Sequence, residues 1–408
     1  MSPQDLRRPA ENSGGIRAGT HYSEHRVAEK AAEVAAKGAL LRAGVSRAPI
    51  ALFFATAAYR RRYAEIVKKI KEITGARNVV GASAFGIITE EMELERRPGV
   101  AVMVIQSEEI QSASFLIPDL QESNFKAGEK AAQLLASAGF NPSLLLLFPD
   151  TFSFQSHAFF DGFESRSGYL PMFGGTAAEN GREQKTYQME GGRAAFDALA
   201  GLALGGNLRV ETGITRSCQP FGEPLRITRA EGNMIYEMDG RPAYDILLES
   251  ISRIDFENPD EILERVFLGL PLRSFQTDFT DSHYLIRNIM GVNVKKGMLA
   301  CVAPVEEGEF VTFAMRDPVF AKADLESMLE DLRMRLDPAD PAFGIYFNCC
   351  SRGKSLYGRP NEDIDLIRRY FPRLPILGFF TYGEIAPVDH VNHIHHYSGV
   401  LSLFTENK

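Results

Sequence analysis

Two adjacent cysteines and an arginine follow a short apolar run near the C-terminus. Residues 343–347 are typical of a buried strand, and Cys349, Cys350, Arg352 and Gly353 come directly after it. A thiol beside a guanidinium is favoured as the thiolate, its reactive form, which makes Cys350 a candidate nucleophile. The alternative is that one cysteine points into the core while its neighbour is only partly exposed.

Arg352 and Gly353 together suit the binding of an anion. The guanidinium can donate paired hydrogen bonds to a carboxylate or phosphate, and glycine lets backbone amides approach the ligand. Glu384 follows the next apolar run and can accept from an amino group. A ligand with both charges, such as an amino acid, fits this pair. The alternative is an ion pair of Arg352 with Glu384 or Asp363.

Four of the chain's eight histidines fall within seven positions, 390–396. His393 and His395 share a face if this segment is a strand, so with a cysteine or Glu384 they are an alternative metal site. The spacing is no zinc signature, and an exposed loop is the favoured explanation. Cys350 with His395 or Glu384 as base is a further alternative, a nucleophilic set. We expect no cofactor.

Ser83 and Thr176 occupy matching positions after two apolar strands, each preceded by small residues. Their hydroxyls are candidates for ligand contact, and tight structural turns are the alternative. The sequence contains no Walker A loop, no GxGxxG fingerprint and no GxSxG elbow. Nucleotide-binding and α/β-hydrolase interpretations therefore lack support.

The segment after the cysteines predicts a helix and then a second strand. Asn361 is a candidate N-cap, apolar residues recur at helical spacing after it, and residues 374–380 are typical of a strand. Strand, helix and strand form a parallel crossover, whose strand-end loops meet at one edge of the sheet. Cys350 and Glu384 are therefore predicted neighbours, although 34 positions separate them.

The strand–helix–strand pattern occurs three times. The glycine of the second strand follows the end of the first strand at a similar spacing each time: Gly81 lies 27 positions after Phe54, Gly174 lies 26 after Phe148, and Gly378 lies 30 after Asn348. This regular spacing indicates a repeated α/β unit. Two extended runs after the first unit, 100–105 and 112–117, are expected to pair with each other.

Residues 217–318 differ from the repeats. A hairpin over 225–238 and extended runs at 283–291, 298–303 and 309–315 predict an antiparallel insertion. Proline and glycine cluster near residue 220, as at a domain boundary. We therefore predict an α/β fold with mixed sheets: a disordered lead-in at 1–19, one α/β domain at 20–220, and a second at 221–408 that carries the insertion.

Composition narrows the function classes. The 408-residue chain has a net charge of −8 and a pI near 5.6, which argues against a nucleic-acid surface. No run of about 18 apolar residues and no signal-peptide core occur, so we expect no membrane contact and a cytoplasmic location. The four cysteines show no C-x-x-C spacing, and their thiols are expected to be reduced.

Several stretches resemble the FIST family. FNCCSRG at 347–353, LPILGFFTYGEIAP at 374–387 and HHYSGVLSLF at 395–404 resemble its C-terminal domain, and VVGASAFGIITE at 79–90 and MFGGTAAENG at 172–181 resemble its N-terminal domain. The resemblance spans about residues 20–405. It implies a sensory, small-ligand-binding module of signal transduction, with amino acids as proposed ligands; eukaryotic relatives carry an F-box. The matching motif positions are Cys350, Arg352, Gly353, Gly378, Gly383 and Glu384.

These observations converge on one hypothesis and one alternative. The hypothesis is a cytoplasmic sensory protein that binds a small polar, amino-acid-like metabolite and signals through a partner protein that the sequence does not identify. The predicted ligand-binding residues are Cys350, Arg352, Gly353, Tyr382, Gly383, Glu384, Ser83 and Thr176. The alternative is a thiol-dependent hydrolase or transferase that uses Cys350 with His395 or Glu384. We expect binding rather than catalysis.

Overall fold

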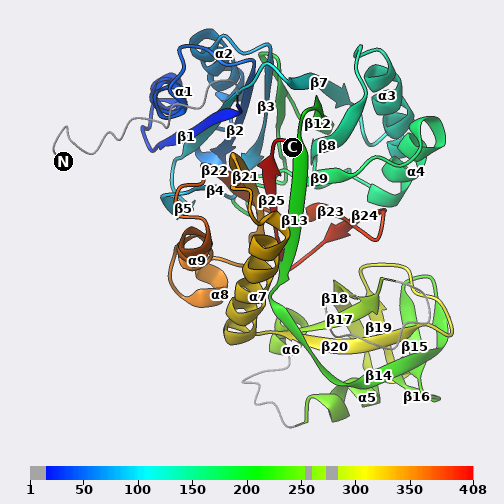
Figure 1. Ribbon diagram of the computed structural model, residues 1–408. Helices are drawn as coiled ribbons and strands as arrows, with labels where there is room; N and C mark the ends of the chain where they lie inside the picture. The colour runs from blue at the N-terminus through cyan, green and yellow to red at the C-terminus, as the bar shows by residue number, and fades with distance from the viewer. Residues whose placement is uncertain (1–14, 253–259, 273–283, 408) are drawn as a thin grey trace. The chain divides into compact units, whose positions relative to one another are not determined.

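The computed structural model describes residues 15–252, 260–272 and 284–407 (Figure 1). Contacts divide the chain into two compact units. The first comprises Met1–Ile214, Glu326–Ile394 and Ser398–Lys408, and the second comprises Thr215–Leu325 and His395–Tyr397. Most of the predicted lead-in, residues 1–14, lies outside the described residues. From Arg17 the chain is already a strand, so structure begins before the predicted boundary at residue 19.

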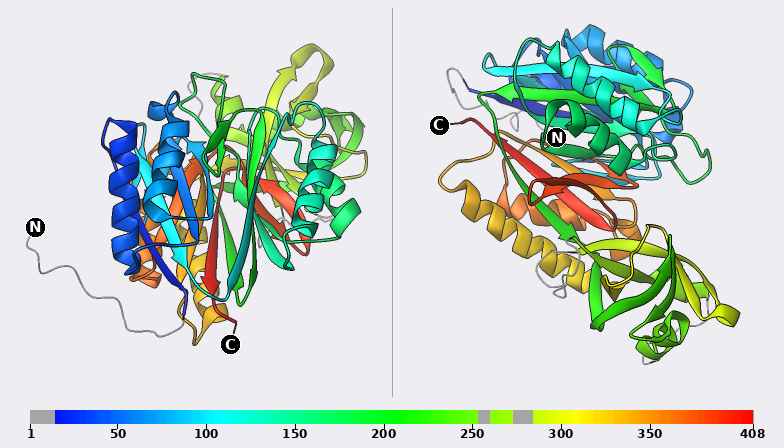
Figure 2. Two further views of the ribbon diagram at one scale, coloured as in Figure 1. Left: turned by 90° about the horizontal axis from the view of Figure 1, so that it is seen from above. Right: turned by 90° about the vertical axis from the view of Figure 1, so that its right-hand side faces the viewer.

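The first repeat forms a mixed sheet at the predicted positions. Its parallel strands are β2 (Ile50–Thr56) and β3 (Asn78–Ala84), connected through η2 (Ala57–Tyr59) and α2 (Tyr63–Thr74). Antiparallel to β2 runs β6 (Val100–Gln106), and β1 (Arg17–Ser23) pairs with β6. Helix α1 (Ala28–Ala43) lies beside α2 on one face of this sheet, where alanines and aliphatic side chains pack against the strands (Figure 2).

The second and third repeats follow the same plan. The second has parallel strands β8 (Pro142–Pro149) and β9 (Met172–Gly175), antiparallel strands β12 (Ala198–Gly206) and β7 (Ile110–Pro118), and helices α3 (Asn124–Ala136) and α4 (Ser156–Ser167). The third has parallel strands β21 (Phe343–Cys349) and β22 (Ile376–Thr381), antiparallel strands β25 (Ser398–Thr405) and β13 (Arg209–Arg216), and helices α7 (Pro318–Leu336), α8 (Lys354–Tyr357) and α9 (Glu362–Tyr370). The predicted repetition is therefore observed.

Each repeat gives a hairpin to the sheet of another repeat. The hairpin that follows β3, made of β4 (Gly86–Thr89) and β5 (Met92–Glu95), extends the sheet of β22. The hairpin that follows β9, made of β10 (Gln188–Glu190) and β11 (Arg193–Ala195), extends the sheet of β3. The hairpin that follows β22, made of β23 (Glu384–Val388) and β24 (Val391–His395), extends the sheet of β9. This cyclic exchange places the third repeat in the same compact unit as the first two. The division by contacts thus differs from the predicted split of the chain near residue 220.

The glycines that marked the repeats lie where two parallel strands come close. A Cβ atom on Gly81 would lie 2.2 Å from the Phe53 carbonyl oxygen, and one on Gly378 would lie 2.2 Å from that of Tyr346. The inner faces of the three sheets share one core, in which Phe54 stacks on Phe379 with ring centroids 4.1 Å apart. The regular spacing of these glycines in the sequence therefore corresponds to a close approach between parallel strands that recurs in the fold.

Strands β6 and β7 do not pair with each other, so that expectation is wrong. β6 pairs with β1 and β2, whereas β7 pairs with β12 in the sheet of the second repeat. Residues 107–109 carry the chain from one sheet to the next.

The second unit is built mainly from antiparallel strands, as predicted for the insertion. Its elements are β14 (Cys218–Glu231), β15 (Met234–Met238), β16 (Arg241–Pro242), α5 (Ala243–Ser250), α6 (Asp260–Arg265), β17 (Val266–Pro271), β18 (Tyr284–Asn293), η3 (Val294–Lys296), β19 (Met298–Cys301) and β20 (Phe310–Arg316). Among the described residues, no helix combines the length and apolar character needed to cross a membrane.

Candidate functional site

The turn that carries Cys350 and Arg352 and the turn that carries Gly383 and Glu384 follow neighbouring parallel strands. Cys349 on β21 is in register with Thr381 on β22, and the Cys350 amide donates to the Thr381 carbonyl oxygen at 2.8 Å. Glu384 follows three residues later, and its charge influences the Cys350 thiol. The crossover therefore brings the two turns together, as its topology predicted.

Arg352 is fully buried and forms an ion pair with Asp363 at the start of α9. Its Nε and Nη2 atoms donate to the two Asp363 carboxylate oxygens, each at 2.9 Å, which is a bidentate geometry. The ion-pair alternative from the sequence is thus the arrangement that the structure shows. The guanidinium fixes the 350–353 turn onto α9 and does not face an open cleft.

Asp363 is the centre of a buried polar network. Besides Arg352, it accepts hydrogen bonds from the Tyr346 hydroxyl at 2.9 Å, the Asn348 amide at 3.0 Å and the Tyr357 hydroxyl at 2.8 Å. Burial alone would raise the pKa of Asp363, but the Arg352 charge and these donors hold it below its ordinary value. The aspartate is therefore ionised, and each of its partners depends on that charge.

The N-terminus of α9 is capped from another repeat. The side chain of Asn361 makes no cap hydrogen bond to the helix; its Oδ1 accepts from the Glu93 amide at 2.7 Å. The Glu93 carboxyl group accepts from the amides of Asn361 and Ile364 at 2.9 and 3.0 Å. Burial, and next the Asp363 charge, raise the pKa of Glu93 to about 8. The β4–β5 hairpin thus supplies the cap expected from Asn361.

Glu384 is fully buried at the start of β23. The Ser398 hydroxyl donates to its Oε2 at 2.6 Å, whereas its Oε1 has no hydrogen-bond partner among the described residues. Burial, with a further contribution from Cys349, raises the pKa of Glu384 well above its ordinary value. Burial of this carboxyl group therefore disfavours the charged form that the amino-acid hypothesis assigned to a ligand's amino group.

Cys350 is half-buried, while Cys349 is buried in the core, as the structural alternative proposed. The hydrogen bond with Cys349, then burial and the nearby Glu384, raise the pKa of the Cys350 thiol well above its ordinary value. Asp363 holds the Arg352 guanidinium that was expected to favour the thiolate. The environment of Cys350 therefore favours the thiol.

Two further predicted residues, Ser83 and Thr176, bind other loops. The Ser83 hydroxyl accepts from the Tyr187 amide at 2.9 Å, and the Ser83 carbonyl oxygen accepts from the Ala178 amide at 2.9 Å. The Thr176 amide donates to the Gly383 carbonyl oxygen at 2.9 Å, and the Thr176 hydroxyl accepts from Thr151 at 2.9 Å. These contacts join the strand-end loops of the three repeats.

The remaining motif residues hold two loops of other repeats. Gly353 has φ of +57°, and a Cβ atom there would lie 2.6 Å from Glu95 Oε1, which accepts from the Lys354 amide at 2.7 Å. The Tyr382 hydroxyl is 3.2 Å from the Glu179 carbonyl oxygen and 3.3 Å from Glu179 Oε1. The C-terminal motif thus fixes the segments that begin at Glu95 and Glu179.

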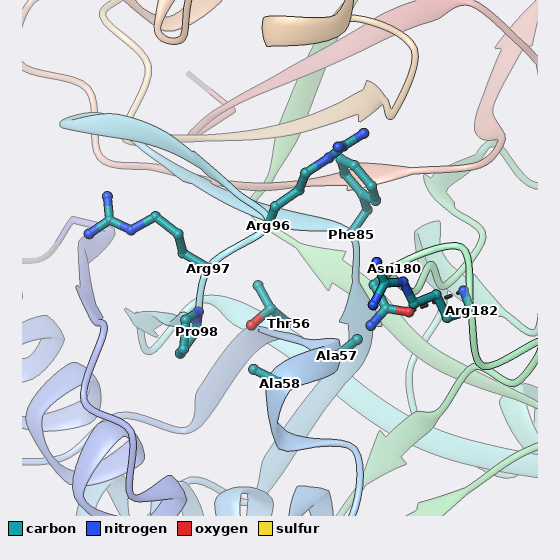
Figure 3. Close-up of a pocket in the computed structure, with 9 residues that line it drawn as sticks. All are labelled: Thr56, Ala57, Ala58, Phe85, Arg96, Arg97, Pro98, Asn180 and Arg182. Atoms are coloured by element: carbon teal, nitrogen blue, oxygen red, sulfur yellow. Dashed lines mark hydrogen bonds between the residues drawn. The ribbon is translucent and has the colours of Figure 1, made fainter.

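Those two segments form walls of a pocket of about 360 Å³ at the carboxyl end of β2 (Figure 3). Its lining residues are Thr56, Ala57, Ala58, Phe85, Arg96, Arg97, Pro98, Asn180 and Arg182. All of them belong to the first unit. The carboxyl end of parallel strands is where ligands of α/β proteins usually bind.

Arginines dominate the charge of the pocket. Arg96 lies over the Phe85 ring at 5.6 Å, and Arg97 forms an ion pair with Glu24. The amide of Arg182 donates to Glu179 Oε2 at 2.9 Å. Sequence reasoning missed these residues, although Arg96-Arg97-Pro98 follows a hairpin and Asn180 and Arg182 lie in or directly after the MFGGTAAENG stretch.

Two of the clustered histidines lie on one strand. His393 and His395 both lie on β24, so this segment is a strand and not the exposed loop of the competing explanation, and His395 is buried. Across the described ranges, no group of three or more histidine, cysteine, aspartate or glutamate side chains could hold a metal ion.

Comparison with known proteins identifies two family domains. Residues 50–241 match the FIST N domain, and residues 243–387 match the FIST C domain. An uncharacterized protein of Mycobacterium tuberculosis is 27% identical over 331 residues, which cover 80% of this chain and 84% of that protein. F-box only protein 22 of Homo sapiens is 30% identical over 76 residues, 18% of this chain and 19% of that protein.

Among solved structures, a cyanuric acid hydrolase from A. caulinodans covers 96% of this chain and 100% of its own. Its sequence identity is 8% and its TM-score is 0.37, too low for the likeness to bear on function.

Proposed function

Since this chain belongs to the FIST family, whose domains are sensory domains of signal transduction, we propose that it binds a small polar metabolite at its strand-end loops. Amino acids are the class of ligand that the family resemblance implies, and they are included among the metabolites to be tested. A cytoplasmic location and a signalling partner protein belong to the same proposal.

One observation carries this proposal: residues of the C-terminal motif form hydrogen bonds to the walls of the pocket that Arg96, Arg97 and Arg182 line. The Lys354 amide donates to Glu95, which precedes the pocket residue Arg96, and the Tyr382 hydroxyl contacts Glu179, which precedes Asn180. A volume near 360 Å³ lies within the range of small-molecule sites. A ligand in the pocket would therefore affect the loops that carry Lys354 and Tyr382, because these loops contact the pocket walls directly.

A screen of small polar metabolites, amino acids included, by thermal shift and then calorimetry tests the proposal. We expect at least one metabolite to raise the melting temperature, because a ligand at about 100 times its Kd stabilises the folded state by about 2.7 kcal/mol. Ala58 lines the pocket and is exposed, so Ala58→Trp should fill the hollow and abolish binding.

The matched control is Ala136→Trp, at the exposed end of α3, which should bind as the wild type does. A complete screen without a binder would refute the sensory proposal. A metabolite that binds the Ala58→Trp variant with unchanged affinity would refute the assignment of the site.

The alternative function, a thiol-dependent enzyme, has a prediction of its own. Because the pKa of the Cys350 thiol is raised, the thiolate is scarce at neutral pH and accumulates only at alkaline pH. We expect iodoacetamide to label Cys350 slowly at pH 7, with a rate that keeps rising about tenfold per pH unit beyond the ordinary cysteine pKa of about 8.5.

Mass spectrometry of the labelled peptide identifies the site, and the Cys350→Ser variant gives the background. Rapid labelling at pH 7 that reaches a plateau below pH 8 would instead support the enzyme.

A further inference from the structure

From the chemistry of the pocket walls we infer that the ligand is a small metabolite with carboxylate or phosphate oxygens and without an ammonium group. This inference rests on the proposed function and names the class of its ligand. It concerns the pocket residues Thr56, Phe85, Arg96, Asn180 and Arg182, which the sequence motifs did not include.

The first observation is an excess of positive charge around one small hollow. Arg96, Arg97 and Arg182 line the same volume of about 360 Å³, and no lining residue is acidic. Only Arg97 has an ion-pair partner, Glu24; within the part of the chain that the structure describes, neither Arg96 nor Arg182 has a carboxylate within ion-pair distance. Like charges around a concave site create a potential that an anion neutralises.

The second observation is the hydrogen-bonding character of the wall. The guanidinium groups have only donors, and the Asn180 side chain already uses its Oδ1 to accept from the Arg182 amide at 3.1 Å. The Thr56 hydroxyl accepts from the Gly99 amide at 3.0 Å, which leaves its proton available to donate. A ligand in this site therefore meets donors, which suit carboxylate or phosphate oxygens.

The third observation is that no residue lining the pocket carries a carboxylate to pair with a ligand's ammonium group. The carboxylates nearest in sequence are already engaged. Glu95, the neighbour of Arg96, accepts from the Lys354 amide at 2.7 Å. Glu179 Oε2 accepts from the amides of Arg182 and Glu183, each at 2.9 Å, and Glu183 forms an ion pair with Arg60 at 3.2 Å. An unpaired ammonium would be desolvated beside guanidinium groups, which is unfavourable. This separates simple organic acids from zwitterionic amino acids.

The walls are held so that the arginines remain in place. The Phe85 amide donates to the Phe380 carbonyl oxygen at 3.3 Å, and the Arg96 guanidinium lies over the Phe85 ring. Glu179 fixes the backbone of Arg182 and is itself fixed by Tyr382. Figure 3 shows that Arg96, Arg97 and Pro98 come from one loop and Asn180 and Arg182 from another, with Thr56 between the two groups and the Arg96 side chain extending over Phe85.

Calorimetry with four matched probes tests the ligand class. Glutarate carries two carboxylates, glutaramide is its neutral isostere, glutamate adds only an ammonium group, and inorganic phosphate represents the phosphate source. We expect glutarate or phosphate to bind, glutaramide not to bind, and glutamate to bind at least fivefold more weakly than glutarate. The stronger of glutarate and phosphate identifies the anionic group.

Substitutions place the binding on the named arginines. Arg96→Gln and Arg182→Gln should each raise the Kd of the bound anion at least tenfold, because each removes a charge-assisted donor. Arg166→Gln makes the same change in net charge at a surface ion pair with Glu129, and should leave the Kd within twofold. Equal losses in all three variants would show a general charge effect and overturn the inference.

Failure of this inference is distinct from failure of the proposed function. If glutamate binds as tightly as glutarate, or if only uncharged metabolites bind in a manner that Ala58→Trp abolishes, the ligand class is wrong while the sensory role stands. If neither these probes nor any screened metabolite binds, both fall.

Discussion

Replacement of Asp363 by Asn is expected to lower the free energy of unfolding by about 3–5 kcal/mol, the usual cost of leaving one partner of a buried ion pair uncompensated. The change leaves the Arg352 guanidinium buried without its counter-charge and weakens hydrogen bonds from Tyr346, Asn348 and Tyr357. Chemical denaturation followed by circular dichroism measures the loss. Labelling of Cys350 should also accelerate, because the 350–353 turn is no longer held to α9.

The effect should depend on pH in a definite direction. The pKa of Asp363 is lowered in the folded state, so its contribution is complete above the ordinary value of 3.8 and is lost as the pH falls through the folded value. The wild type and the Asp363→Asn variant should therefore converge in acid.

Asp365→Asn is the matched control for this substitution. Asp365 lies on the same helix but is exposed, and its ion pair with Arg368 spans 3.7 Å, so its loss should cost less than about 1 kcal/mol. Equal stability of the two variants would show that the buried pair does not hold the turn.

Gly378→Ala is expected to lower the free energy of unfolding of the first unit by on the order of 3 kcal/mol. In a unit of this size, that loss should lower the melting temperature by several degrees. The new methyl group would lie 2.2 Å from the Tyr346 carbonyl oxygen and 3.2 Å from Ile88 Cβ. The carbonyl belongs to the backbone of the adjacent parallel strand, so relief requires that β21 and β22 separate. Thermal unfolding of the purified variant measures the effect.

Gly344→Ala in the same strand pair provides the comparison. The nearest atoms to a Cβ atom there are side-chain atoms: those of Leu374 and Leu403 at 3.1 Å, which can move by a few tenths of an ångström, and one of Ile376 at 3.6 Å. Its cost should stay below about 1 kcal/mol. If Gly378→Ala were as mild as Gly344→Ala, the close approach of the strands would not explain the recurrent glycine.

The local elements of the fold could be predicted from the sequence because their signals are local. The apolar run at Ile50–Thr56 and the helical stripe that ends before Gly75 are observed as β2 and α2. The spacing from Phe148 to Gly174 marked the second repeat, since only glycine fits against the neighbouring carbonyl group. The crossover rule then placed Cys350 near Glu384, because handedness leaves few other arrangements.

Partners that are distant in the chain were decided by the tertiary structure. Asn361 is of a residue type that favours the N-cap position, yet the side chain that caps α9 is Glu93, 268 residues away. Glu93 reaches α9 because the β4–β5 hairpin joins the sheet of the third repeat. Arg352 had two possible carboxylate partners in the sequence, and packing brought it to Asp363.

The sequence by itself determined the α/β class, the threefold repetition, the antiparallel insertion and the resemblance to the FIST family, since each follows from composition, period or short motifs. Only the tertiary structure decided that the motif residues Arg352 and Glu384 are buried and that Arg96 and Arg182 line the open pocket. The physical reason is that the exposure of a side chain depends on which hairpin covers which strand end. That arrangement is set by packing between residues of different repeats.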